Sequence, residues 1–125
     1  MKRWWACSRG KRGCLKAYDF SSWPADIVCI RLLSNDANGM KVRDSLAQDR
    51  DHVVQGCLRL LQKVRKNNPA AQIVWILPGS EAYPDIGREA VRRAIDAGMT
   101  KITCFALPDY TEADYGARAH PNADW

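Results

Sequence analysis

The stretch "NNPAAQIVWILPG", Asn67 to Gly79, holds the pattern that decides the fold. Its centre, "QIVWIL", is a short, nearly continuous apolar run rich in branched residues, which is typical of a strand that is covered on both faces. Pro78 and Gly79 follow the run directly, and "NNP" separates it from a helical pattern that precedes it. The stretch therefore predicts a buried strand that directly follows a helix.

The segments on either side repeat this alternation. A long helix is predicted before the strand, because apolar residues recur at helical spacing: Leu46, Val53, Val54, Cys57, Leu58, Leu61 and Val64. A second helix is predicted from Pro84 to a C-terminal cap at Gly98. The run at 27–33, interrupted only by Arg31, is typical of a strand covered on both faces, and the run at 101–107 predicts a third strand. Strands that alternate with helices through short loops indicate an α/β fold with a parallel sheet.

Polar loops follow all three predicted strands. They are "SNDANG", "PGSEAYPD" and the long segment that begins with "PDYTEADYG". Because ligands of parallel sheets gather beyond the carboxyl ends of the strands, we expect a functional site at this edge.

Most of the positive charge lies in the first sixteen residues. The chain of 125 residues has a formal net charge of +5, and six of its 19 Lys and Arg residues precede residue 17, where no acidic residue occurs. The rest of the chain carries 13 basic and 14 acidic residues. We interpret residues 1–16 as a basic tail outside the fold. Trp4 and Trp5 in it could stack on bases, but no folded basic module follows, so nucleic-acid binding is not favoured.

The five cysteines are scattered, and no Cys-x-x-Cys pair or metal-ligand spacing with His52 or His120 occurs. We therefore predict no metal and no cofactor. Three of them are expected to be buried: Cys29, Cys57 and Cys104. Unpaired thiols favour a reducing, cytoplasmic environment, although the compartment stays open. No apolar run reaches the roughly 20 residues of a membrane helix, so no membrane partner is predicted.

Two blocks resemble the SGNH (GDSL-type) hydrolases. "YDFSSWPADIVCIRLLSND", from Tyr18, is similar to the family block in which a buried strand ends in Gly-x-Asn-Asp, and "DYGARAHPN" is similar to the late His-Pro block. The residues around the two motifs are most similar to those of the acetyl esterases of carbohydrate esterase family 2. The resemblance implies a three-layer, flavodoxin-like α/β fold over residues 17–125, present in part because the family's first strands have no counterpart here. It also implies an acylated carbohydrate or another small ester as substrate.

The resemblance assigns roles to two residues. Asn35 matches the amide that donates a hydrogen bond to the oxyanion of ester hydrolysis, and His120 matches the general base. On local sequence alone, Asn35 and Asp36 could instead form an Asx-turn that caps the strand. His52, on the long helix, is expected to face solvent.

The sequence also departs from the family pattern. The Gly-Asp-Ser block that carries the nucleophile is absent, and neither Ser34 nor Ser80 occupies its position. Leu33 stands where the family usually has glycine. The family's acid before the histidine falls on Arg118 or Ala117, and the more distant substitutes are Asp109 and Asp114.

Two functional interpretations follow. The first is an ester hydrolase that lacks its nucleophile block and turns over little substrate alone. The alternative is a non-catalytic α/β interaction module, because the strand at 27–33 would be an open edge that favours self-association.

Overall fold

The computed structural model describes residues 19–36, 39, 46–77, 84–108 and 111–116. The elements follow one another as η1 (Phe20–Ser22), β1 (Ile27–Ile30), α2 (Leu46–Asn67), β2 (Gln72–Leu77), α3 (Pro84–Asp96), β3 (Ile102–Ala106) and η2 (Glu112–Asp114). Residues 34–36 and residue 39 are also helical. The predicted alternation of strands and helices is confirmed, with element bounds shifted by a few residues.

The three strands form one parallel sheet in the order β1-β2-β3. In the register of the sheet, Val74 of β2 lies between Cys29 of β1 and Thr103 of β3. β1 is shorter than the predicted strand at 27–33 and ends at Ile30. The parallel α/β fold class is therefore confirmed, and "QIVWIL" is the central strand.

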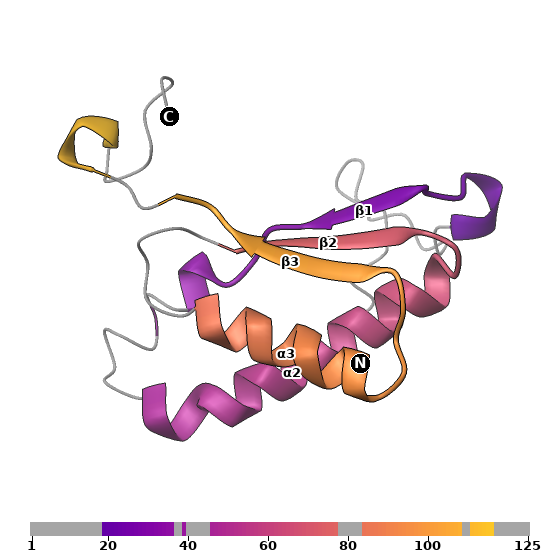
Figure 1. Ribbon diagram of the computed structural model, residues 1–125, viewed down its shortest axis with the longest axis horizontal. Coiled ribbons are helices and arrows are strands. Elements are labelled where there is room, and N and C mark those ends of the chain that lie inside the picture. The colour runs from indigo at the N-terminus through magenta and orange to yellow at the C-terminus, as the bar shows by residue number, and fades with distance from the viewer. Residues whose placement is uncertain (1–18, 37–38, 40–45, 78–83, 109–110, 117–125) are drawn as a thin grey trace, which may run out of the picture.

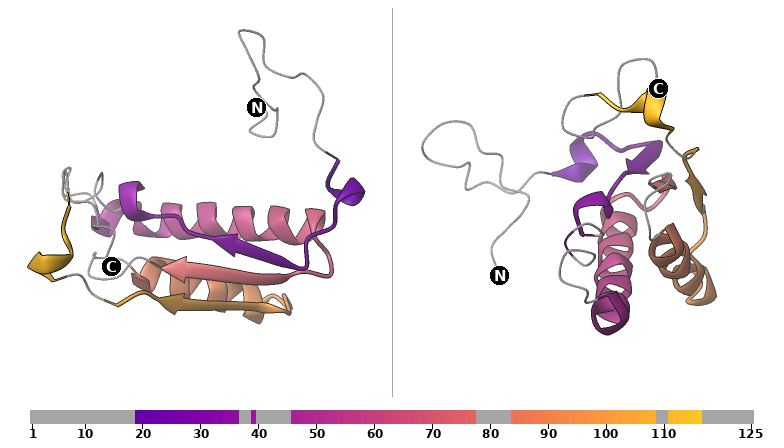
Figure 2. Two further views of the ribbon diagram at one scale, coloured as in Figure 1. Left: turned by 90° about the horizontal axis from the view of Figure 1, so that it is seen from above. Right: turned by 90° about the vertical axis from the view of Figure 1, so that its left-hand side faces the viewer.

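Both helices cover the same face of the sheet (Figures 1 and 2). Along β2, Ile73, Trp75 and Leu77 are fully buried, while the residues between them are half-buried. The core on this side also takes in residues of both helices: Val54, Cys57, Leu61, Ile86, Ala90, Val91 and Ala94. This one-sided packing explains the helical spacing of apolar residues from which the sequence predicted α2.

The opposite face of the sheet has no covering layer among the described residues. Ile27 and Phe105 are 62% and 48% exposed, and Cys29 is exposed rather than buried. The prediction that the strand at 27–33 is covered on both faces was therefore wrong for β1. Cys104 of β3, which was also expected to be buried, is half-buried. Of the three layers that the resemblance implies, the described residues build two, which agrees with a fold that is present in part.

A left-handed turn at Leu33 follows β1. The φ angle of Leu33 is 94°, which is a strained value for a residue with a side chain, and it occurs at the position where the resembling family has glycine. The Leu33 side chain is 6% exposed and belongs to the core. Its Cδ1 lies 3.5 Å from the point that a Cβ would occupy at Gly87 of α3. Burial of the leucine therefore offsets the cost of the turn.

The loops at the amino edge of the sheet are held by Arg65 near the end of α2. Its Nη1 donates to the carbonyl oxygens of residues 68, 69 and 71, and its Nη2 donates to those of residues 100 and 101, over 2.7 to 3.2 Å. One guanidinium group thus joins the loop before β2 to the loop before β3. Gly98, with φ 91°, caps α3 as predicted, because Met99 N donates to Ala94 O across it.

Replacing Arg65 tests this connection. We expect Arg65→Lys to lower the free energy of unfolding by about 2 to 4 kcal/mol, because a lysine ammonium cannot reach both loops with a planar fork of donors. Arg59→Lys, an exposed position on the same helix, serves as the matched control and should change stability by less than about 0.5 kcal/mol. Urea unfolding curves of the two variants measure the difference. Equal stability of both variants would contradict the role of Arg65.

The turn at Leu33 yields a second test. Leu33→Ala removes buried side-chain volume and keeps the strained φ, whereas Leu33→Gly removes the volume and relieves the strain. We expect both variants to be less stable than the wild type, and Leu33→Gly to be more stable than Leu33→Ala by about 1 kcal/mol. Thermal or urea unfolding reports the order. Elsewhere in a chain an alanine variant is usually at least as stable as a glycine variant. If Leu33→Ala were at least as stable as Leu33→Gly, the turn would not be left-handed.

Candidate functional site

The carboxyl edge of the sheet brings the predicted oxyanion donor to the position expected for a site. β1 ends, the chain turns at Leu33, and Ser34, Asn35 and Asp36 are helical directly after it. Asn35 is exposed and Ser34 is half-buried. The strand and the buried Leu33 therefore fix the backbone that carries the Asn35 amide.

The Asn35 side chain makes no hydrogen bond to another described residue. In an Asx-turn the Asn35 oxygen accepts from the backbone N–H two residues on, which belongs to Ala37 and lies outside the described residues. The described part of the chain therefore does not test the local alternative, an Asx-turn that caps the strand. Because the Asn35 side chain is exposed, its amide N–H bonds can donate to an acceptor oxygen that approaches from solvent.

The other predicted catalytic residue cannot be placed beside Asn35. His120 lies outside the described residues, and so do Ser80, Asp109, Ala117 and Arg118. Asp114 is described, and its carboxylate accepts hydrogen bonds from the backbone N and the Oγ1 of Thr111 at 2.6 and 2.7 Å. These bonds hold the pKa of Asp114 below its usual value. Asp114 therefore caps η2 as an ionised carboxylate.

A hollow of about 290 Å³ lies on the α2 side of the Leu33 turn. Leu33 and Asp36 line it from the turn, and His52 and Cys57 line it from α2. His52 is exposed, as predicted. The sequence analysis did not identify this cluster, because residues 36 and 57 meet only through tertiary packing and no motif joins them.

Cys57 is not suited to be a nucleophile. It is 6% exposed, and burial, together with the negative charge of Asp36, raises its pKa to about 11. At neutral pH it is therefore a protonated thiol, and the reactive species of a cysteine is the thiolate. Its predicted role as a small buried hydrophobe is confirmed.

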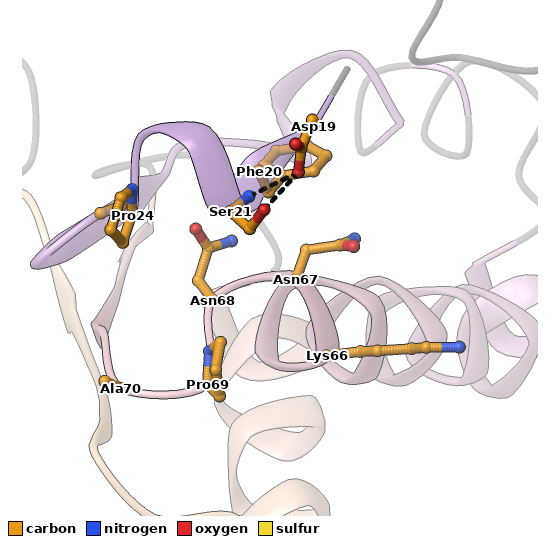
Figure 3. A pocket seen from close by; sticks show the side chains of 10 residues that line it. Asp19, Phe20, Ser21, Pro24, Lys66, Asn67, Asn68, Pro69 and Ala70 are labelled. Carbon is orange, nitrogen blue, oxygen red and sulfur yellow. Dashed lines mark hydrogen bonds between the residues drawn. The ribbon is translucent and has the colours of Figure 1, made fainter. Parts of the chain in front are cut away.

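A second hollow, of about 620 Å³, lies at the amino edge of the sheet (Figure 3). Asn67 and Asn68 form its wall at the end of α2, and Asp19 and Ser21 line it from η1 and its N-cap. Asp19 accepts from Ser21 N and Oγ at 2.9 and 2.6 Å. This hollow is at the opposite end of the strands from Asn35, so the two belong to different edges of the fold.

Neither a metal site nor a membrane segment is found within the described residues. No group of three or more His, Cys, Asp or Glu side chains there is arranged to hold a metal ion. Among the described helices, none combines the length and the apolar character required to cross a bilayer.

Comparisons with known proteins agree with the geometry. No protein-family model matches the sequence, and no curated protein matches it. Solved structures do match. An acetyl xylan esterase from the rumen bacterium Butyrivibrio proteoclasticus superposes with a TM-score of 0.76 and 25% identity over 87% of this chain. A family two carbohydrate esterase from Clostridium thermocellum, solved in complex with cellohexaose, superposes with a TM-score of 0.67 and 22% identity over 84% of this chain.

The match covers 35% and 33% of those two esterases, so the chain spans about a third of their length. A third matching structure, with a TM-score of 0.68 and 19% identity, is that of a carbohydrate esterase. The active site of that esterase is described as having divergent catalytic and non-catalytic binding functions. The sequence-based resemblance is confirmed: the chain has, in part, the fold of the SGNH-type carbohydrate esterases of family 2.

Proposed function

We propose that the chain carries part of the active site of an ester hydrolase that acts on acylated carbohydrate. The observation that carries the proposal is the exposed Asn35 side chain, which follows the buried Leu33 turn at the carboxyl end of β1. The fold shared with carbohydrate esterases supports it. The solved relative that holds cellohexaose supports the carbohydrate half of the substrate.

Asn35 has the chemistry of an oxyanion donor. Ester hydrolysis passes through a tetrahedral intermediate whose carbonyl oxygen becomes negatively charged. A neutral amide on a rigid backbone donates a hydrogen bond to this oxygen without introducing a charge that would need desolvation. Asn35 Nδ2 is our candidate for this donor.

His120 is our candidate for the general base, because its near-neutral pKa in solution suits proton transfer to and from an alcohol. The nucleophile is the missing component. The sequence has no Gly-Asp-Ser block, and Ser34, the nearest described serine, precedes Asn35 directly on the same helical turn. We therefore expect the isolated chain to bind an acylated sugar without hydrolysing it at a substantial rate.

Binding of acetylated and deacetylated xylo-oligosaccharides tests this function. We expect the wild type to prefer the acetylated form, and Asn35→Ala to weaken that binding about fivefold, the contribution of one neutral hydrogen bond. Asn35→Asp is the matched control of equal size: it replaces the donor by an anionic acceptor and should weaken binding at least as much. Isothermal titration calorimetry measures all three proteins.

The same samples report turnover through released acetate. We expect a rate close to that of buffer, because the chain supplies no serine in the family's position. Acetate release that disappears in His120→Ala would show that a nucleophile is present after all. Equal affinity for acetylated and deacetylated sugar, unchanged in Asn35→Ala, would argue against an esterase site.

A second candidate function is an interaction module that acts through the open face of the sheet. The strand residues on this face include no charged side chain: Ile27, Cys29, Gln72, Val74, Ile76, Thr103 and Phe105. Two copies of such a face can approach each other without like-charge repulsion and bury apolar surface. Self-association is therefore the form of interaction that we favour.

A charge on the open face tests self-association. Cys29→Lys places the charge on the open face, where Cys29 is exposed. We expect light scattering to detect a dimer of the wild type at high concentration and a monomer of Cys29→Lys. Gln55→Lys, on an exposed face of α2, is the control. A monomeric wild type at every concentration would exclude this function.

A further inference from the structure

Large apolar side chains are exposed along the segment that contains β1. Trp23, Ile27 and Leu32 are each more than half exposed, and they are three of the six exposed large hydrophobic residues in the described part of the chain. β1 itself, "IVCI", holds neither a charged residue nor a proline. Edge strands of natural proteins usually carry such residues, because they prevent pairing with another chain. β1 therefore lacks the protection of a strand that stays at an edge.

The outer edge of β1 presents backbone groups that no other described strand uses (Figure 1). Gln72 N donates to Asp26 O at 2.8 Å, and Ile27 lies opposite Gln72 in the parallel register. In a parallel ladder a residue bonds to the two residues that flank its partner, so Gln72 uses Asp26 and Val28. The N–H and C=O groups of Ile27 and Cys29 therefore point away from β2.

The complement of such an edge is a further strand, whose own N–H and C=O groups pair with those of β1. A strand added parallel to β1 would end at the carboxyl edge of the sheet, where Asn35 lies. Neighbouring strands are about 4.8 Å apart, so the residues directly after the added strand would lie beside Asn35. A strand added at β3 would end about 14 Å from β1, three strand spacings away.

This difference selects the edge of β1 for a partner that takes part in ester hydrolysis. The nucleophile and the oxyanion donor must both lie about 3 Å from the same reacting group, which a strand at β1 allows and a strand at β3 does not. The nucleophile is also the component that the sequence lacks, since it has no Gly-Asp-Ser block. The free edge and the missing group thus belong to the same end of the same strand.

We propose that the outer edge of β1 binds a parallel strand of a second polypeptide, and that a serine directly after this strand is the nucleophile that the chain lacks. The inference rests on the proposed esterase function and names the partner of that site. The acetyl xylan esterase of the same fold has about two thirds of its length outside the match, because the match covers 35% of it. That length has room for the strand and for a layer over the open face.

The reaction balances between the two polypeptides. The oxygen of the partner's serine forms a bond to the acyl carbon, and His120 takes the serine proton. His120 passes this proton to the sugar oxygen as the bond between that oxygen and the acyl carbon breaks. Water then attacks the acyl-serine, its proton passes through His120 to the serine oxygen, and the acid leaves. In both steps the oxyanion accepts from Asn35 Nδ2.

The part of the Butyrivibrio esterase that precedes the matched region is the probe for the partner. It is co-expressed with the full chain, and size-exclusion chromatography with light scattering measures complex formation. We expect a one-to-one complex. In the complex, NMR should show slower hydrogen exchange of the Ile27 and Cys29 amides, because these outward-pointing donors become paired.

Activity of the complex locates the nucleophile. We expect the complex, and neither polypeptide alone, to release acetate from acetylated xylan and to react with a fluorophosphonate, a reagent that modifies activated serines. Peptide mass spectrometry should find the modified serine on the partner. Asn35→Ala should lower acetate release about 10²-fold and leave complex formation unchanged.

Proline substitutions test the edge. Ile27→Pro removes an outward-pointing N–H at the first position of β1, where proline leaves the bonds to β2 in place. We expect it to weaken the complex at least about tenfold. Ala106→Pro is the matched control, because Leu107 N donates to Leu77 O and the N–H of Ala106 therefore points to the other free edge, that of β3. It should leave the complex unchanged.

The outcomes separate this inference from the proposed function. Absence of a complex, or unchanged exchange of the Ile27 and Cys29 amides within it, would overturn the inference even if Ile27→Pro does not fold. A dimer of the chain itself that Ile27→Pro dissociates would also overturn it, because a second copy would then occupy the edge. A modified serine on this chain would do the same. Acetate release that Asn35→Ala does not change would instead contradict the proposed role of Asn35 and leave the docked strand in place.

Discussion

The packing of α2 and α3 on one face of a parallel sheet is the constraint on which the rest of the structure depends. β2 lies between its neighbours, and its fully buried residues Ile73, Trp75 and Leu77 all point to the helices. Parallel sheets normally bury both faces. Here the described residues cover one face, and among them the other face and the outer edge of β1 have no neighbouring layer or strand.

The same constraint shapes the candidate site. Leu33 accepts a left-handed backbone because its side chain reaches the core between β1 and α3. That turn places residues 34–36 at the carboxyl edge, where Asn35 is exposed, while Asp36 lines the hollow together with Trp75 and Cys57. The strain at Leu33 and the exposure of Asn35 thus both follow from how the chain turns after β1.

Local patterns predicted much of this fold. The helical spacing around Cys57 and Leu61, the cap at Gly98 and the apolar run of β2 each depend on neighbours in sequence. The open face could not be predicted, because "DIVCIRL" is equally apolar whether or not a layer covers it, and exposure of Cys29 depends on which elements pack nearby. Asn35 was found through a motif. The Asp36, Cys57 and Trp75 cluster was missed, because its members come from three separate elements.

The reactivity of the cysteines tests the one-sided sheet most directly. Iodoacetamide at neutral pH, at a concentration where the protein is monomeric, should modify Cys29 at the rate of an exposed thiol. Cys57, buried and with its pKa raised to about 11, should react at least about a hundredfold more slowly. Peptide mass spectrometry separates the two sites. Protection of Cys29 equal to that of Cys57 would mean that a further layer covers the sheet and would contradict this account.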